Sequence, residues 1–345
     1  MNNKLKIIGY AICLNEEHQV DDFVNNMLTI CDKLIIVDTG SVDNTIFKLS
    51  VYDRVYVVEK KFNPWDFAEA RNYCLSLIDD DCDICIAVDL DERFSYNTRD
   101  ELQKIWICNE TNNVRYPLQS TEDIMIYGFK IHSRHGYKWV YPIHEILEFI
   151  DSLECQENVL VNESIICSHK QTQRDRSDYR RLLKNMVDDS PLNPRFSYQY
   201  ARELLNHNCY KQSFDEYQRC LTLCDCYDLS NVNGNSQIQW ACWRSMGYIS
   251  QLQNRSLNMN LRYQLKAFAC YPYARESYLW LSNAWELVGN YNQAYSMLRS
   301  GLSITDKKLS FEIETQCWNS DELLNKLKYL KNSDKKESLS SNDPI

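Results

Sequence analysis

Ile84–Glu92 reads ICIAVDLDE, a short apolar run that ends directly in acids. Such a run is typical of a strand buried on both faces of a parallel sheet. In open α/β sheets, ligands bind in the crevice beyond the carboxyl ends of the strands, which is where Asp89 and Asp91 would lie. Two carboxylates offset by two residues suit a hard divalent cation. A solvated turn is the alternative, because Asp and Glu often close strands.

Strand-like and helical segments alternate upstream of this stretch. The strand-like runs are Ile7–Cys13, Lys33–Val37 and Val55–Val58, and helical patterns cover Val20–Ile30 and Phe67–Ile78. This alternation predicts a mainly parallel, doubly wound, Rossmann-like α/β sheet. Residues 114–170 contain short strand-like pieces without a helical pattern, which predict antiparallel additions and hence a mixed sheet.

Polar residues also follow the first two strand-like runs. The first run ends in Leu14-Asn15-Glu16-Glu17, and the second ends in Asp38-Thr39-Gly40-Ser41-Val42-Asp43-Asn44-Thr45. Gly40 permits a tight turn, and Asp43 can cap a following helix. Because the carboxyl ends of parallel strands share one edge of a sheet, the sequence predicts a binding site at that edge.

The pattern becomes helical after His169 and contains a weak repeat. Two sets of residues align at identical spacing: Tyr200, Ala201, Leu204, Ser213, Tyr217 and Cys220 against Leu281, Ser282, Trp285, Ala294, Leu298 and Gly301. The spacing is that of the tetratricopeptide pattern of about 34 residues, and generic amphipathic hairpins are the alternative. We expect an α/β domain over 1–175, an all-α tetratricopeptide-like domain over 176–331 and a disordered tail over 332–345.

Composition limits the classes of function. A chain of 345 residues is long enough for two domains, and its net charge of −10 disfavours a polyanionic partner. Its 15 cysteines are scattered and odd in number, and no secretory signal or apolar span is evident. We therefore expect reduced thiols and a cytoplasmic protein without a transmembrane segment, in a host cytoplasm if the chain is viral.

In their order along the chain, these motifs resemble family 2 glycosyltransferases of the GT-A fold. The similarity is to the branch with C-terminal tetratricopeptide repeats, which includes enzymes that glycosylate bacteriocin cysteines. It spans residues 6–305 and rests on Cys13–Glu17, Ile35–Thr45, Trp65–Asn72, Asp89–Glu92 and His144-Glu145. The resemblance implies an inverting, metal-dependent transfer of a sugar from a nucleoside diphosphate sugar, most simply a UDP-sugar.

The resemblance also implies a role for each site residue. Asp89, Asp91 and His169 would hold Mn²⁺ or Mg²⁺ as a Lewis acid for the leaving diphosphate. Contacts to the nucleotide sugar are expected from Leu14, Asn15, Glu17, Asp38, Gly40, Asp43, Arg71, Asp89, Leu90 and His144. Catalysis is assigned to Glu145 as the base that deprotonates the acceptor, together with Asp91 and Arg71.

Purely structural roles remain as alternatives for these residues. Arg71 could form a salt bridge to the same acids, and His144-Glu145 could be a buried structural pair. The chain departs from the family pattern at Leu90, where a small residue is more usual. It departs again at Arg93, whose charge could tighten or partly replace the metal.

The sequence does not identify the acceptor. A peptide, a protein or a glycan is favoured, and a modified nucleic-acid base is the alternative. The helical repeats would bind the acceptor or form a homodimer. A catalytically inactive scaffold that recruits a peptide is the competing hypothesis. A Rossmann-type dehydrogenase is excluded, because Gly-x-Gly-x-x-Gly does not follow the first strand.

Overall fold

A computed structural model of the chain describes residues 5–108, 110–121, 124–150, 156–169, 178–226, 232–253, 255–304 and 320–340. The chain divides into two compact units, Met1–Asp175 and Arg176–Ile345. The boundary falls within 170–177, which lies outside the described residues. The first unit contains the sheet, and the second is helical.

The first unit alternates strands and helices up to β4 and then becomes richer in strands. Its strands are β1 Ile7–Cys13, β2 Lys33–Asp38, β3 Val55–Glu59, β4 Ile84–Ala87, β5 Glu92–Phe94, β6 Thr111–Thr121, β7 Ile124–Ser133, β8 Tyr137–Val140, β9 Ile146–Phe149, β10 Glu157–Val161 and β11 Cys167–His169. Its helices are α1 Val20–Met27, α2 Thr45–Ser50, α3 Phe67–Ser76 and α4 Thr98–Ile105.

The main sheet is mixed, with the order β3-β2-β1-β4-β7-β6-β11-β5 and with β10 paired to β6. Strands β1 to β4 are parallel to one another, as the alternation predicts. Strand β7 runs antiparallel to both β4 and β6. Strands β10 and β11, in contrast, pair in parallel with β6, so that the additions are only partly antiparallel.

Helices cover both faces of the parallel strands. Ile7 and Ala11 of β1 face one core together with Phe23 of α1, and α2 and α4 contribute to the same core. Ile8 and Tyr10 face the opposite core, together with residues of α3 and β8. Because side chains alternate along a strand, an apolar run without polar interruptions is what this two-sided burial requires.

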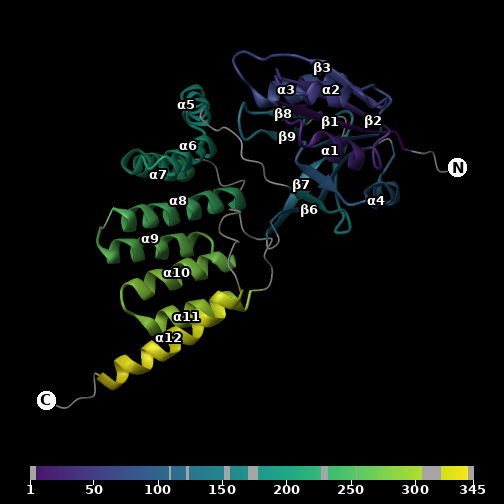
Figure 1. Ribbon diagram of the computed structural model, residues 1–345. Helices are drawn as coiled ribbons and strands as arrows, with labels where there is room; N and C mark the ends of the chain where they lie inside the picture. The colour runs from purple at the N-terminus through teal and green to yellow at the C-terminus, as the bar shows by residue number, and fades with distance from the viewer. Residues whose placement is uncertain are drawn as a thin grey trace. The chain divides into compact units, whose positions relative to one another are not determined.

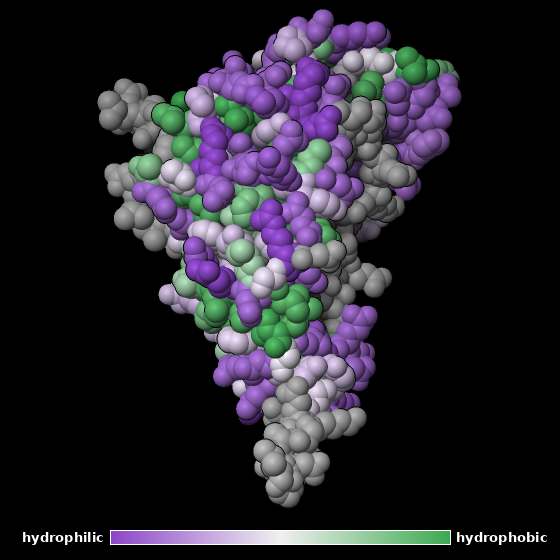
Figure 2. Space-filling view, turned by 90° about the vertical axis from the view of Figure 1, so that its left-hand side faces the viewer, coloured by the Kyte–Doolittle hydropathy of each residue, from purple (hydrophilic) through white to green (hydrophobic). Residues whose placement is uncertain are grey.

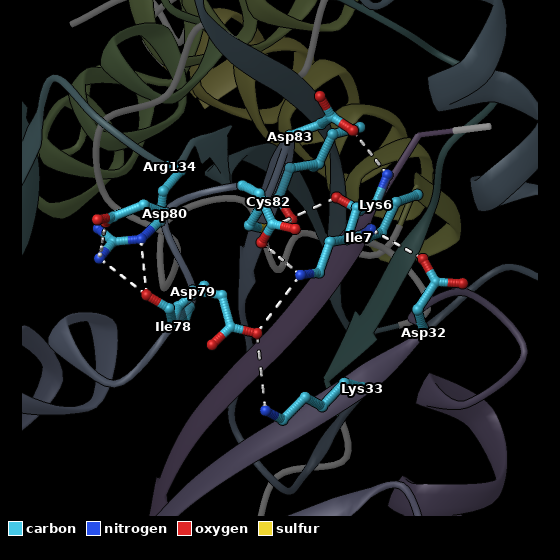
Figure 3. Close-up of polar contacts among 12 residues, drawn as sticks. Lys6, Ile7, Asp32, Lys33, Ile78, Asp79, Asp80, Cys82, Asp83 and Arg134 are labelled. Carbon is cyan, nitrogen blue, oxygen red and sulfur yellow. Dashed lines mark hydrogen bonds and ion pairs between the residues drawn. The ribbon is translucent and has the colours of Figure 1, made fainter. Parts of the chain in front are cut away.

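The opposite, amino-terminal edge of the sheet is held by an acidic turn (Figure 3). The backbone N–H of Lys6 donates to Asp83 Oδ2 at 2.7 Å, and Lys6 Nζ pairs with Asp79 at 3.4 Å. Arg134 donates to the carbonyl of Ile78 at 2.9 Å. The acids of this turn therefore anchor strands within the fold, and we do not regard the turn as a ligand site.

A close approach between β6 and β7 gives a first testable prediction. Gly128 lies opposite Tyr116, and a Cβ atom at Gly128 would lie 2.5 Å from Cζ of the buried Tyr116 ring. Gly128→Ala is therefore expected to lower the free energy of unfolding by about 1–3 kcal/mol, the usual range for overpacking. Urea denaturation measures this change. An unaltered midpoint would show that the ring can move aside.

The second unit is built from helices that pack on their neighbours in chain order (Figure 1). They are α5 Tyr179–Asp189, α6 Pro194–Asn206, α7 Tyr210–Cys226, α8 Val232–Leu252, α9 Leu257–Cys270, α10 Arg275–Leu287, α11 Tyr291–Leu302 and α12 Ser320–Ser340. The pairs α6–α7, α8–α9 and α10–α11 form successive hairpins. This arrangement is tetratricopeptide-like.

The aligned repeat residues occupy equivalent places in two of these hairpins. In α6–α7, Ser213 Oγ donates to the carbonyl of Ala201 at 2.7 Å. In α10–α11, Ser282 Oγ donates to the carbonyl of Ala294, also at 2.7 Å. Ala201 aligns with Ser282, and Ser213 aligns with Ala294. The two hairpins therefore make the same bond, but the serine donor is on the second helix in α6–α7 and on the first helix in α10–α11. All four residues are fully buried, as close helix contact requires.

The last helix extends beyond the predicted end of the helical domain. Helix α12 continues to Ser340, so it includes part of the segment 332–345 for which the sequence predicts a disordered tail. Residues 341–345 lie outside the described residues. In the part of the chain that the structure describes, every helix is too short or too polar to cross a bilayer.

Candidate functional site

The polar loops after β1 and β2 meet at the carboxyl edge of the sheet. Cys13, the last residue of β1, lies beside Asp38, the last residue of β2. Asp38 is fully buried, and its Oδ1 accepts backbone N–H bonds from Gly40 at 2.9 Å and Ser41 at 2.8 Å. Asp38 therefore shapes its own loop. Gly40 has a φ of 123°, which favours glycine at this turn.

Three of the residues expected to contact the nucleotide, Asn15, Glu17 and Asp43, join these two loops to each other. Asn15 adopts a φ of 54°, and its Oδ1 accepts the backbone N–H of Val42 at 2.8 Å. Asp43 Oδ2 accepts the backbone N–H of Glu17 at 3.2 Å. Hydrogen bonds from Asn44 lower the pKa of Glu17. These hydrogen bonds join the two loops, and the neighbouring Leu14 side chain is 51% exposed.

Arg71 of α3 is the centre of the candidate site. It is buried, and its Nη2 donates to Asp89 Oδ1 and its Nε to Glu145 Oε1, each at 2.7 Å. Burial opposes the charge, but the two carboxylates raise the pKa of Arg71 well above its ordinary value. The Trp139 ring lies 4.9 Å from the guanidinium carbon. Among the described residues, Arg71 Nη1 has no hydrogen-bond partner.

Local contacts bring Glu145 to Arg71. The Asp66 side chain caps α3 by accepting the backbone N–H of Glu69 at 2.8 Å. The next residue, Phe67, donates its N–H to the carbonyl of Pro142 at 2.9 Å, which attaches the loop before Glu145 to the start of the helix. The Asn72 side chain bonds the backbone of Trp139 in both directions, at 2.8 and 2.9 Å. These contacts bring a loop that is distant in sequence to α3.

Lys130 of β7 is a site residue that the sequence analysis did not find. Its Nζ donates to Asp89 Oδ2 at 2.9 Å and to Glu92 Oε1 at 2.8 Å. Despite burial, the two carboxylates raise the pKa of Lys130 above its ordinary value. No motif marks this lysine. One signal in the sequence could have identified Lys130. It is a lysine within the strand-like run 125–131, and a charged side chain that is buried in a strand needs an oppositely charged partner.

Asp91 lies next to His169, the last residue of β11. Strand β11 pairs antiparallel to β5, which sets His169 opposite Glu92. His169 Nε2 then lies 3.2 Å from Asp91 Oδ2, and the Asp91 side chain is 2% exposed. The hydrogen bond to Asp91 raises the pKa of His169, against the effect of burial.

The raised pKa of His169 predicts a pH dependence of stability. A raised folded-state pKa stabilises the fold fully below the ordinary value of 6.5, and this contribution is lost as the pH rises through the folded-state pKa. We expect His169→Gln to lower the free energy of unfolding at acidic pH and to have a smaller effect at alkaline pH. Chemical denaturation of both proteins across this range measures the difference. A constant difference would contradict the His169–Asp91 pairing.

The predicted metal ligands do not fit a divalent cation as they are arranged. Both oxygens of Asp89 accept hydrogen bonds from cations, and the His169 nitrogen that faces Asp91 is engaged with its carboxylate. Within the described ranges, no three His, Cys, Asp or Glu side chains lie close enough to hold a metal ion.

The structure also places Leu90, Arg93 and His144, which the sequence singled out. Leu90 is fully buried in the core and is not placed to contact a nucleotide sugar, because its side chain packs with the apolar residues of β1 and β4. Arg93 Nη1 donates to the carbonyl of Leu90 at 2.6 Å, so its guanidinium holds the turn backbone. His144 has a φ of 51° in the loop that presents Glu145.

Comparisons with known proteins give limited similarity. No protein-family model matches the chain, and no curated protein matches it. Among solved structures, the chain is similar to the MamA RS-1 ArsTM double mutant at 14% identity and a TM-score of 0.32, over 46% of this chain and 86% of that one. It is similar to yeast Tom70 at 12% identity and a TM-score of 0.38, over 48% of this chain and 31% of Tom70.

These comparisons overturn the resemblance to family 2 glycosyltransferases of the GT-A fold. The structures named above are tetratricopeptide-repeat proteins, and neither a family model nor a curated protein matches in support of that family. The family assignment is therefore wrong. Its motifs are short, and local structure accounts for several of their residues: Asp38 closes its own turn, and Asp43 Oδ1 accepts the N–H of Thr45 at the start of α2.

Proposed function

We propose that the first unit binds a nucleoside diphosphate sugar at the carboxyl edge of β1, β2 and β4 and transfers the sugar to an acceptor. The observation that carries this proposal is the environment of Arg71. A buried guanidinium, whose Nη1 amino group has no partner among the described residues, lies directly beside Glu145. Such a transfer needs at least two groups: a fixed cation that stabilises the leaving diphosphate, and a nearby carboxylate that accepts the proton of the acceptor.

The chemistry assigns separate tasks to the two groups. A hydroxyl or thiol of the acceptor attacks the anomeric carbon of the sugar, and its proton passes to Glu145. The bond from that carbon to the phosphate oxygen breaks, and the diphosphate leaves with the electron pair. Arg71 stabilises the charge that develops on the diphosphate through its Nη1 group, because Nε and Nη2 are already bonded to Glu145 and Asp89. Attack opposite the leaving group inverts the anomeric centre.

The loops after β1 and β2 would hold the nucleoside. They lie at the same edge as Asp89, and their backbone is fixed by the bonds between Asn15, Val42, Glu17 and Asp43. Loops that are joined before the ligand arrives lose little conformational entropy on binding.

A hydrolysis assay tests this proposal. The full chain is incubated with a panel of nucleoside diphosphate sugars, with and without Mn²⁺, and release of the nucleoside diphosphate is measured. We expect release from one class of donor, and thermal stabilisation by the matching nucleoside diphosphate. No release and no stabilisation with any donor in the panel would reject the proposal.

A second candidate function is binding of a protein segment by the helical unit. The observation in its favour is the run of successive hairpins, which is an architecture that presents extended binding surfaces. Apolar side chains gather in patches among polar ones on the side of the molecule viewed in Figure 2. Separately from that view, the exposed large hydrophobic side chains of the helical unit include those of Tyr248, Leu257, Leu265 and Tyr273. Such a partner would be the acceptor, or the cargo of a scaffold.

Peptide-array capture by the full chain distinguishes the scaffold from the transferase. Capture of peptides without release of nucleoside diphosphate from any donor supports the scaffold. Release of nucleoside diphosphate accelerated by a captured peptide supports a transferase whose acceptor is that peptide. The net charge of −10 predicts that captured peptides are basic or neutral.

A further inference from the structure

We propose that Lys130 and Arg71 together supply the positive charge for the diphosphate, so that this site binds a nucleoside diphosphate without a divalent cation. The proposal rests on the function proposed above and assigns Lys130 as a ligand-binding residue. Four features of the site support it.

The first feature is that both carboxylate oxygens of Asp89 already accept hydrogen bonds from cationic side chains. Arg71 Nη2 lies 2.7 Å from its Oδ1, and Lys130 Nζ lies 2.9 Å from its Oδ2. A divalent cation bound to this carboxylate would lie next to a guanidinium and an ammonium group at once. Like charges at such distances in a partly buried site repel strongly. A metal would therefore have to displace at least one of the two side chains.

The second feature is the orientation of His169. Its Nε2 lies 3.2 Å from Asp91 Oδ2, so that this ring nitrogen faces a carboxylate. A metal ligand must instead direct a nitrogen lone pair at the ion. This geometry places Nε2 as a hydrogen-bond donor to Asp91 and leaves no lone pair on that nitrogen for a metal.

The third feature is the balance of charge. Four carboxylates lie around Arg71 and Lys130, namely Asp89, Asp91, Glu92 and Glu145, and three permanent cations act on them: Arg71, Lys130 and Arg93. This cluster, without the acids of the loops after β1 and β2, therefore carries no large excess of negative charge that an added dication would have to neutralise.

The fourth feature is the donor capacity of the two cations. Arg71 Nη1 carries N–H groups without a partner among the described residues. An ammonium group such as that of Lys130 has three donors, of which two point to Asp89 and Glu92. Guanidinium and ammonium groups are the side chains that proteins use to bind phosphate directly. A diphosphate can therefore bind both cations while the carboxylates keep them in position.

Calorimetric titration with uridine diphosphate tests the proposal. The probe is titrated into the full chain once in EDTA and once in Mn²⁺. We expect binding in EDTA, with a dissociation constant that Mn²⁺ changes by less than about twofold. Lys130→Met is expected to weaken binding in EDTA by about tenfold or more, because a charge-assisted hydrogen bond is lost.

Two control variants make the result specific to Lys130. Lys104→Met removes a lysine that also pairs with a carboxylate, Glu101, but is 66% exposed on α4, and it should bind as wild type does. Lys130→Arg keeps the charge and should retain binding in EDTA. If Lys130→Met does not fold, the wild-type titrations and Lys130→Arg still decide the proposal.

Two outcomes would overturn the inference. One leaves the proposed function intact, and the other rejects the proposed function as well. If the wild-type chain binds uridine diphosphate only in Mn²⁺, the site needs a metal, and the proposed function survives without this inference. If it binds no nucleoside diphosphate from a panel of bases in either condition, the proposed function fails and the inference fails with it.

Discussion

Glu145→Gln is expected to lower the rate of the proposed sugar transfer by about 10²–10⁴-fold, the usual contribution of a general base. Its amide oxygen can still accept the hydrogen bond that Arg71 Nε donates to Glu145 Oε1 at 2.7 Å. Arg71 also keeps its ion pair with Asp89. The variant should therefore fold, bind the donor with an unchanged dissociation constant, and fail only in deprotonating the acceptor.

The measurement is the turnover number with the donor that the hydrolysis panel identifies, together with the dissociation constant for that donor. Glu148→Gln is the matched control, because Glu148 lies nearby on β9 but is exposed to solvent. It should leave the turnover number unchanged. An unaltered turnover number for Glu145→Gln would remove Glu145 as the base and leave it as a structural partner of Arg71.

Arg71→Met should have the largest effect on stability. We expect the free energy of unfolding to fall by about 3–5 kcal/mol, because the substitution leaves carboxylates buried without their cation. The side chain of Arg71 is 5% exposed, and those of Asp89 and Glu145 are 19% and 14% exposed. The contact with the Trp139 ring is lost as well. Urea denaturation, followed by fluorescence and by circular dichroism, measures the change.

Arg181→Met provides the control for Arg71→Met. Arg181 is also paired with an acid, Asp178, but its side chain is 56% exposed, so removal should change stability by no more than about 0.5 kcal/mol. Adding Glu145→Gln to Arg71→Met should recover part of the loss, since one uncompensated charge is removed. If Arg71→Met unfolds at the same urea concentration as Arg181→Met, the three side chains do not form a buried ion pair network.

Much of the first unit could be predicted from particular residues. The apolar runs at Ile7–Cys13 and Ile84–Val88 correctly predicted β1 and β4, because strands buried on both faces must be apolar throughout. Helix α4 and strand β5 were not predicted. Strand β5 has only three residues and begins at Glu92, inside the acidic motif, where no periodicity can be read.

The candidate site was only partly predictable. The ends of β1, β2 and β4 meet at one edge, so Asn15, Asp38 and Asp89 could be grouped from topology alone. The partner of each acid could not be predicted in the same way. Lys130 is 41 residues from Asp89, and Glu145 is 74 residues from Arg71, so neither contact leaves a local pattern.

The sequence by itself determined the positions of the parallel strands, the acids at their ends and the small residues of the helical repeat. Each of these follows from local chemistry: burial requires apolar runs, and close helix packing requires small side chains. Only the tertiary structure decided that Asp89 holds two cations, because that depends on the register of β7 against β4 and on the side of α3 that faces the sheet. Pairing between distant charges is a property of the packed fold, and it decides whether the acidic edge needs a metal.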